Sequence, residues 1–403
     1  MPNNTRPPAA EERIEGIVAE NAVEALRLRL RRMTSPTICA RMLAAKYPTL
    51  TERAVKEKSE GIASSLRSAL GYWESAPVTL NARILNQYYF MLQLSIAEQV
   101  ATNAQDSTLA AIQRHTENGH GLATLQASDS VFPDNYYVFA LKSGHFGSFC
   151  RSLGIDTNTF AFGERRREWL KVTDDDKKKF LTLTDLLRRV PELRSAIYPC
   201  LSAPALSFHI DHSSKNMSLR AERATEKMQA TGQFAAPNWG PDPSEGPTTE
   251  TYLTFATGFG GGEGVTAEYL NSLDLPIKEI HAEHDSLSER AELIGVYAHP
   301  SSEYWWKSLP LYNGVNGTSL MVPFWGLSDV FLLHFVILYA LSIVVRYLPS
   351  LWFEIDHGSL DHIKALLEEY MVITDRVLPR LAIERIAGVK LRVVAPGSLF
   401  GPT

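Results

Sequence analysis

Arg346 is the residue whose type and position point most directly to chemistry. It leaves a long apolar segment and is followed at once by Tyr347. A guanidinium can hold a carboxylate or a phosphate through two parallel hydrogen bonds, and an aromatic face beside it adds cation–π attraction. We therefore predict an anion-binding site, whose members are Arg346, Tyr347, Trp352, Tyr88 and His120. The alternative is that Arg346 only caps a helix and stacks on Trp352.

Arg114 and His120 form a second candidate, for catalysis. An imidazole can move a proton, and a guanidinium can stabilise charge that develops on a phosphate. An arginine followed by a histidine at about the spacing of Arg114 and His120 is expected roughly twice by chance in a chain of this composition. Gly119 and Gly121 predict a loop around His120.

Two groups of histidines and aspartates have the spacing of metal ligands. On a strand, His209 and Asp211 would share a face while His212 points away. Isolated pairs of this kind are common on surfaces, so we expect surface histidines, no metal and no other cofactor. The two groups are His209, Asp211 and His212, and His281, His284 and Asp285.

Two further patterns suggest chemistry less strongly. The glycine run at 258–264 lies between a predicted strand and helix, where phosphates often bind. It lacks the lysine of a P-loop, and Glu263 would repel phosphate. Cys150 lies close to His145 in the chain, and we expect it to be a buried structural thiol.

A long apolar helix must position Arg346. The segment 328–346 is hydrophobic on every side, so it must be buried in a large core or in lipid. Ser328 or Asp329 can cap its first turn, and Pro349 prevents its continuation. The sixteen residues between Asp329 and Arg346 span roughly 24 Å, less than the ~30 Å of a hydrocarbon layer. We expect the central core helix of a soluble protein, with no membrane partner.

The composition is that of an ordinary soluble protein. The chain has 403 residues, 45% hydrophobic and 21% charged, with a net charge of -5, so no overall basic excess points to nucleic acid. Three scattered cysteines exclude a disulfide framework and fit a reducing compartment. The N-terminus lacks the apolar segment of a secretory signal. We therefore expect a cytoplasmic protein.

Hydrophobic periodicity predicts a mainly helical α+β fold. We expect a helical bundle around 328–347 with a smaller insertion that contains β-strands. The expected parts are a disordered 1–10, an N-terminal helical part 11–200, a β-containing part 201–325 with a flexible loop 231–250, and C-terminal helices 326–403 that pack on the N-terminal part.

Within these parts the individual elements follow from period and turn residues. Helices are predicted at 11–33, 51–73, 80–102, 361–380 and, ending at Pro191, at 181–193. Strands are predicted at 205–212, 251–257, 276–284, 293–300 and 391–398. Loops are predicted at 114–125 and 142–154, and the charged run 164–180 is predicted to be a solvated surface with a helix capped by Thr173 or Asp174.

Several of these pieces resemble the YaaC-like family of bacterial proteins, and the likeness spans roughly 75–375 in the same order. The pieces are QYYFMLQLSIAE with Tyr88 and Tyr89, HGL at His120–Leu122, SGHFGSF with Gly144 and Phe146, TLTDLLRRVPEL, and LYALSIVVRYLPSLW with Arg346, Tyr347, Pro349 and Trp352. The resemblance implies a bacterial cytoplasmic protein and assigns no reaction. Residues 231–264 look like an insertion relative to that pattern.

The two adjacent tyrosines followed by HGL also resemble, more faintly, the first helix and loop of HEPN domains. That resemblance implies RNA cleavage, with Arg114 and His120 in the catalytic roles. Our preferred expectation is a non-catalytic binding or regulatory protein for an anionic ligand or partner. The alternative is a HEPN-like ribonuclease or phage-defence effector. The partner would be an anionic small molecule or RNA, and a homo-oligomer is compatible with the sequence.

Overall fold

The computed structural model describes residues 13–75, 77–128, 130–232, 241, 246–257, 261–284, 291–314 and 317–394. The expected disorder of 1–10 lies outside these residues, as does most of the predicted loop 231–250. The chain divides into two compact units. The first unit comprises the chain up to Leu183 together with the chain from His334 onward, and the second is Thr184–Leu333.

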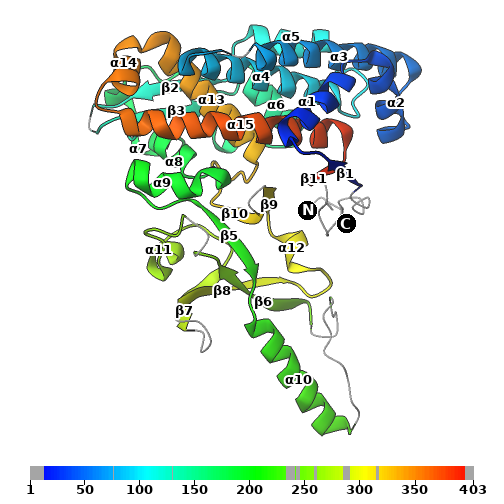
Figure 1. Cartoon of the computed structure of the whole chain (residues 1–403), viewed down its shortest axis with the longest axis vertical. Coiled ribbons are helices and arrows are strands. Elements are labelled where there is room, and N and C mark those ends of the chain that lie inside the picture. Colours follow the sequence, from blue (N-terminus) through cyan, green and yellow to red (C-terminus); the bar gives the residue numbers. More distant parts are fainter. Residues whose placement is uncertain are drawn as a thin grey trace. The chain divides into compact units, whose positions relative to one another are not determined.

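Long helices form most of the first unit. In Figure 1, α3, α4 and α15 run side by side, and α4 packs against both of the others. The helices are α1 (Ala22–Arg32), α2 (Pro36–Lys46), α3 (Glu52–Glu74), α4 (Leu80–Val100), α5 (Leu109–Glu117), α6 (His145–Ser152), α7 (Asp174–Lys177), α14 (Pro349–His357), α15 (Asp361–Ala387) and most of α13 (Val330–Tyr347).

Local signals account for where these helices begin. The hydroxyl of Thr51 accepts a hydrogen bond from the amide of Ala54 at the start of α3. Thr173, one of the two predicted caps, forms a capping box with Asp176 at α7. At the start of α13 the carboxylate of Asp329 accepts hydrogen bonds from the amides of Phe331 and Leu332. The predicted helices at 51–73, 80–102 and 361–380 are confirmed, and the last of them extends to Ala387.

The helix α13 is the apolar helix predicted around 328–346. It has the length and hydropathy of a membrane-spanning helix, and 78% of its 18 residues are buried inside the protein. Every side chain from Val330 to Ser342 is buried. Such burial is typical of a core helix of a folded domain.

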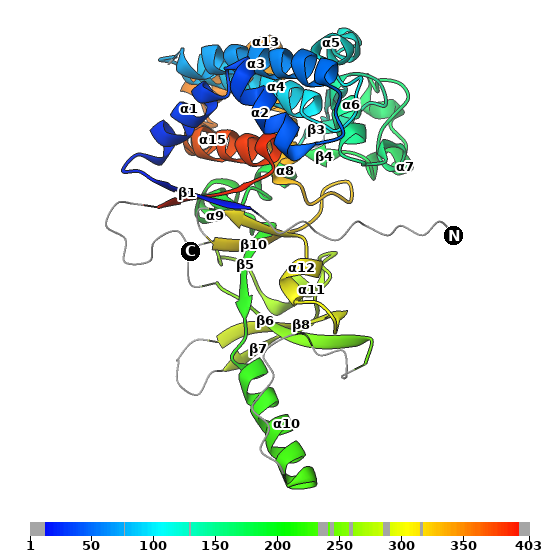
Figure 2. The ribbon, with the colours of Figure 1, turned by 90° about the vertical axis from the view of Figure 1, so that its right-hand side faces the viewer.

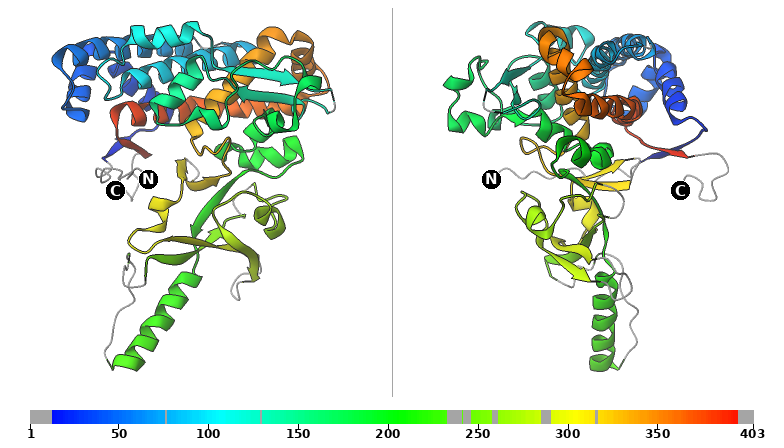
Figure 3. Two further views of the ribbon diagram at one scale, coloured as in Figure 1. Left: turned by 180° about the vertical axis from the view of Figure 1, so that it is seen from behind. Right: turned by 60° about the vertical axis from the view of Figure 1, so that its left-hand side comes forward.

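Two small sheets complete the first unit. The strands β2 (Leu122–Gln126), β3 (Tyr136–Ala140) and β4 (Leu181–Thr182) form an antiparallel sheet, and Figure 3, left, shows the first two as turquoise arrows. Its aromatic residues pack around Phe139 and Phe180. In the second sheet β1 (Ile14–Val18) pairs in parallel with β11 (Lys390–Val394).

Several sequence predictions about individual elements are wrong. Ile14–Val18 is a strand instead of the first turns of a helix, because its β-branched residues pair with β11 at the other end of the chain. The predicted loop 142–154 contains α6, and Gly144 starts this helix instead of breaking it. The helix predicted at 181–193 is only Leu183–Leu187, because Leu181–Thr182 pairs with β3.

The second unit is built on a six-stranded antiparallel sheet in the order β7-β8-β6-β5-β10-β9. The strands are β5 (Ser207–His212), β6 (Thr248–Phe255), β7 (Lys278–His284), β8 (Ala291–Pro300), β9 (Leu311–Gly314) and β10 (Gly317–Met321). The short helices α8 (Leu183–Leu187), α9 (Arg194–Leu201), α11 (Ala267–Asn271) and α12 (Trp305–Ser308) accompany it. Its core includes Phe208, Phe255 and Leu320. The predicted strands in this region are confirmed, and the chain is a mainly helical α+β protein with a β-sheet insertion.

The helix α10 (Lys215–Thr231) was not predicted. Figure 2 shows that it extends away from β5 and β6 of the same unit. It is anchored at its first turn, where the Asn216 side chain bonds to the backbone of Ser213 and Tyr252. Most of its described side chains are exposed, so it has little apolar periodicity from which to predict it.

Candidate functional site

Arg346 lies in the last turn of α13 and is half-buried. Its Nε donates to the carbonyl oxygen of Ser342 at 3.0 Å, and one terminal nitrogen donates to the Ser342 hydroxyl at 3.0 Å. The guanidinium carbon is 6.0 Å from the ring centre of Tyr88 and 5.2 Å from that of Tyr347. No carboxylate of the described residues pairs with it. The remaining N–H groups are therefore available to a ligand.

Tyr88 and His120 meet beside this guanidinium. The hydroxyl of Tyr88, from α4, lies 2.7 Å from Nδ1 of His120, in the turn before β2. Burial raises the pKa of the Tyr88 phenol. Burial and the charge of Arg346 lower the pKa of His120. The phenol is thus protonated and the imidazole neutral at pH 7, so Tyr88 donates to Nδ1 and the ring proton is on Nε2.

Tyr339, also from α13, connects these residues. Its ring centre is 5.9 Å from that of His120 and 6.1 Å from that of Tyr88. Its hydroxyl donates to the carbonyl oxygen of Leu122 at 2.7 Å. Burial raises the pKa of the Tyr339 phenol, and the charges of Arg165 and Arg346 lower it in part. We call Tyr88, His120, Tyr339 and Arg346 the Arg346 cluster.

The charge of Arg165 also acts on this cluster, because it lowers the pKa of the Tyr339 phenol in part. Its backbone belongs to the charged run that was predicted to be a solvated surface, and the residue is exposed. Sequence reasoning missed it because nothing in the run distinguishes one arginine from its neighbours. The charges of two arginines, Arg165 and Arg346, therefore act on the Tyr339 phenol.

Two glycines hold His120 in place. The amides of His145 and Phe146 donate to the carbonyl oxygens of Gly119 and His120, both at 2.9 Å. At Gly144, with φ of 97°, a Cβ would lie 2.5 Å from the Gly121 nitrogen. Only glycine tolerates this backbone conformation and this approach. The glycines of HGL and SGHFGSF therefore bring the His120 turn onto the first turn of α6.

The other predicted site residues lie elsewhere. Trp352 is on α14 and half-buried, and the aromatic faces beside Arg346 are those of Tyr88 and Tyr347. Arg114 is exposed on α5, while the arginine whose charge acts on His120 is Arg346.

The histidines with ligand-like spacing lie in the second unit. On β5, His209 is half-buried while Asp211 and His212 are exposed. On β7, the Nε2 of His281 lies 2.8 Å from a carboxylate oxygen of Glu283. Within the described ranges no group of three or more histidine, cysteine or acidic residues could hold a metal ion. Asp285 and part of the glycine run, 258–260, lie outside those ranges.

His145 and Cys150 are buried on α6. The Nε2 of His145 lies 2.8 Å from the hydroxyl of Ser95, and its Nδ1 lies 3.3 Å from that of Thr116. Burial lowers the pKa of His145 to about 3. This is a neutral, hydrogen-bonded core histidine.

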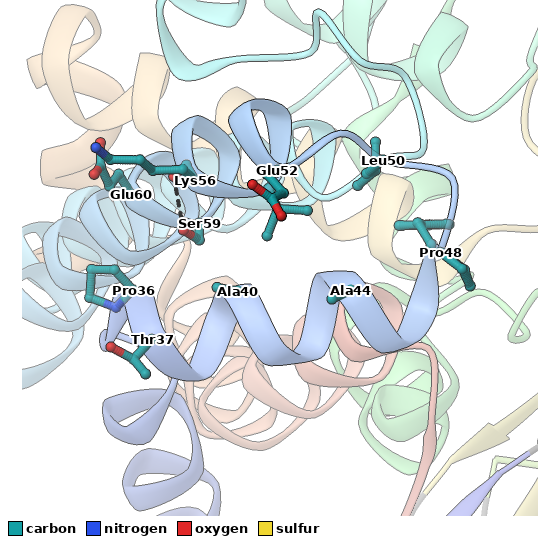
Figure 4. Close-up of a pocket in the computed structure, with 12 residues that line it drawn as sticks. Pro36, Thr37, Ala40, Ala44, Pro48, Leu50, Glu52, Lys56, Ser59 and Glu60 are labelled. Carbon is teal, nitrogen blue, oxygen red and sulfur yellow. Dashed lines mark hydrogen bonds between the residues drawn. The ribbon is translucent and has the colours of Figure 1, made fainter.

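A groove of about 430 Å³ lies between α2 and α3 (Figure 4). Small side chains of α2, among them Thr37, Ala40 and Ala44, form one wall, and Lys56 and Glu60 of α3 lie on the other. The groove contains no member of the Arg346 cluster.

Comparison with protein-family models matches residues 31–386 to the family described as YaaC-like Protein. No curated protein and no solved structure matches the chain. The matched range contains every member of the Arg346 cluster, and it includes the segment 75–375 in which the resemblance was expected. The chain belongs to the YaaC-like protein family.

Proposed function

We propose that this protein is a non-catalytic binding or regulatory protein that takes an anionic ligand at the Arg346 cluster. One observation supports this most: a half-buried guanidinium lies against two aromatic rings without a carboxylate partner among the described residues. Partial burial of a cation without an anion costs free energy. A bound anion would remove that cost.

The polar atoms of the cluster favour binding over chemistry. The pKa of the Tyr88 phenol is raised, so the phenol stays protonated at neutral pH and does not act as a base. Its proton is directed to His120. The proton of Tyr339 is directed to Leu122. What remains for a ligand is a set of N–H donors on Arg346 and on Nε2 of His120. Such a set recognises acceptor-only groups.

Thermal shift measurements with nucleotides and anionic metabolites test this proposal. We expect at least one of them to raise the melting temperature of the wild type and not that of Arg346→Ala. Arg67→Ala is the matched control, because Arg67 is exposed on α3. Equal stabilisation of the wild type and Arg346→Ala, or no stabilisation by any of these anions, would contradict the proposal.

The second candidate is the ribonuclease or defence effector. The observation that favours it is an imidazole and a guanidinium on either side of Tyr88, the two side-chain types that cleavage of RNA would use to move a proton and to stabilise phosphate charge. Expression of the wild type would then arrest growth and degrade RNA. His120→Ala would abolish both effects, and comparison of Arg114→Ala with Arg346→Ala would show which arginine takes part. Growth arrest that persists in His120→Ala excludes this site.

A further inference from the structure

We propose that the ligand presents a carboxylate to the end of the Arg346 guanidinium, where the two terminal nitrogens bind its two oxygens, and that Ser342 sets this orientation. The inference rests on the proposed function and deepens it. It names the chemical class of the anion and gives Ser342 a positioning role.

Ser342 occupies one edge of the guanidinium. Its carbonyl oxygen accepts a hydrogen bond from Nε of Arg346, and its hydroxyl accepts one from Nη2, both at 3.0 Å. In arginine, Nε and Nη2 form a fork of parallel N–H groups along the side of the guanidinium, and Nη1 and Nη2 form a second fork at its end. The side fork is therefore occupied, and the end fork remains for a ligand.

The Ser342 side chain is itself held in place. It is fully buried on α13, and its hydroxyl donates to the carbonyl oxygen of Tyr339 at 2.7 Å. A serine hydroxyl has one proton, so a hydroxyl that donates to Tyr339 can only accept from Arg346. The helix thus fixes an acceptor against the guanidinium, and this acceptor determines which edge of Arg346 a ligand can meet.

The charge of the contacts favours a singly charged anion. Arg346 contacts a serine and two phenol rings, so its guanidinium supplies the positive charge among these groups. One fork and one charge match a carboxylate, which has two equivalent oxygens. A phosphate monoester carries a charge near -2 above its second pKa of about 6 and would leave a negative charge unbalanced. Arg165, whose charge acts on Tyr339, is exposed to solvent, where charges are screened.

The rings beside Arg346 also favour a flat anion. The guanidinium carbon lies over both rings, 6.0 Å from the ring centre of Tyr88 and 5.2 Å from that of Tyr347. When arginine stacks on an aromatic face, the ring lies beside the plane of the guanidinium. A carboxylate on the end fork lies in that plane, whereas a sulfonate or a phosphate places further oxygens outside it, towards the negative faces of the rings. Planarity therefore distinguishes a carboxylate from another singly charged anion.

Calorimetric titration of the full chain with benzoate, benzenesulfonate and phenyl phosphate tests the ligand class, because these probes share a phenyl ring and differ in the anion. At pH 8 we expect benzoate to bind the wild type at least about tenfold more tightly than the others, the effect of one charge-assisted hydrogen bond. Arg346→Lys keeps the charge without the fork, so it should weaken benzoate by about ten- to a hundredfold and remove its advantage over benzenesulfonate. Arg67→Lys, at an exposed position of α3, should bind all three probes like the wild type.

Ser342→Ala tests the positioning role. It removes the acceptor of Nη2 and leaves every donor of Arg346, so the preference for benzoate over benzenesulfonate should fall by about three- to tenfold. Ser342→Thr keeps the hydroxyl and should restore the preference. Ser95→Ala is the matched control, since Ser95 is also a fully buried helical serine whose hydroxyl donates to the carbonyl oxygen three residues before it. An unchanged preference in Ser342→Ala would show that Ser342 does not position the guanidinium.

Nitrogen chemical shifts of the Arg346 side chain give a readout that needs no substitution in the core. Benzoate on the end fork should shift the Nη signals and leave the Nε signal, whose N–H stays on the Ser342 carbonyl oxygen, nearly unchanged. The absence of these signals from Arg346→Lys assigns them. A larger shift at Nε than at Nη would show that the ligand displaces Ser342 and binds the side fork, contrary to the inference.

The failures of the two proposals are distinguishable. If benzenesulfonate or phenyl phosphate binds at least as tightly as benzoate, and Arg346→Ala abolishes that binding, the ligand class is wrong and the proposed function stands. Benzoate that binds equally to the wild type and to Arg346→Ala would overturn both. If none of the three probes binds the wild type, the inference is wrong, and the wider screen of anions decides the proposed function.

Discussion

The hydroxyl of Tyr88 lies 2.7 Å from Nδ1 of His120, although the two residues come from different elements and are separated by 32 positions. This contact determines which nitrogen of the imidazole carries its proton, because a buried phenol at neutral pH is a donor. It directs the Nε2 donor of His120 away from the phenol. A ring that was free to change tautomer would lack this preference.

Tyr88→Phe should allow His120 to exchange between its two neutral tautomers, with little loss of stability. We expect the free energy of unfolding to fall by about 1 kcal/mol, the net contribution of one hydrogen bond. The nitrogen chemical shifts of the imidazole should move towards a mixture of the two tautomers. Tyr89→Phe is the control, since Tyr89 is the adjacent half-buried tyrosine and the side-chain hydrogen bond of His120 goes to Tyr88. An unchanged imidazole spectrum in Tyr88→Phe would contradict the assignment.

Acid should destabilise the helical unit through two buried histidines. Burial lowers the pKa of His145 and of His334 to about 3 in the folded protein, from 6.5. As the pH falls below about 6.5, both histidines become protonated in the unfolded chain while they stay neutral in the folded protein. The free energy of unfolding is therefore highest above about pH 6.5 and decreases between about pH 6.5 and pH 3. Within this window each histidine lowers the free energy of unfolding by about 1.4 kcal/mol for each unit of pH. Urea denaturation at a series of pH values measures this dependence of the free energy of unfolding on pH.

A double variant isolates one of these protons. The Nδ1 of His334 lies 3.0 Å from the hydroxyl of Tyr370, and both side chains are fully buried. His334→Phe with Tyr370→Phe removes both partners and leaves neither unpaired, which is often close to neutral at pH 7. The stability of this variant should depend less steeply on pH. The same slope as in the wild type would show that His334 does not titrate on unfolding.

Gly144→Ala should be among the most destabilising single substitutions in the chain. Its backbone has φ of 97°, and the new Cβ would lie 2.5 Å from the nitrogen of Gly121. We expect a loss of about 3 kcal/mol or more from the strain and the overlap together. Gly154→Ala is the matched control, because Gly154 also has positive φ, 76°, but has nothing within 4 Å of the new atom. It should cost only about 1 kcal/mol. Equal losses would show that the close approach of the two loops is not required.

Asp375 should be important for the packing of three helices. From α15 its carboxylate accepts hydrogen bonds from Trp73 of α3 at 2.9 Å, from Arg83 of α4 at 2.6 Å and from Gln87. Asp375→Ala leaves three donors without their acceptor, so we expect a loss of about 2–3 kcal/mol. Glu369→Ala, at an exposed position of the same helix, should change the stability little. Chemical denaturation compares the two variants.

Elements with strong local periodicity were predictable from the sequence. The apolar run of α13, the stripe of α4 and the alternation of β5 follow from the spacing of side chains within one segment. The same run indicated that Arg346 ends a buried helix, which is why it was identified as a site residue. Tyr88 and His120 were associated with it only as parts of a shared family pattern.

The tertiary structure decided whatever depends on distant partners. Ile14–Val18 is a strand because β11, at the far end of the chain, supplies its hydrogen bonds. Gly144 begins a helix because the turn at Gly121 fits against it, which the spacing of glycines does not reveal. The charge of Arg165, unlike that of Arg167, acts on the Tyr339 phenol. Periodicity within a segment reports which face is buried, whereas the identity of the residue facing a guanidinium depends on chain folding over hundreds of positions.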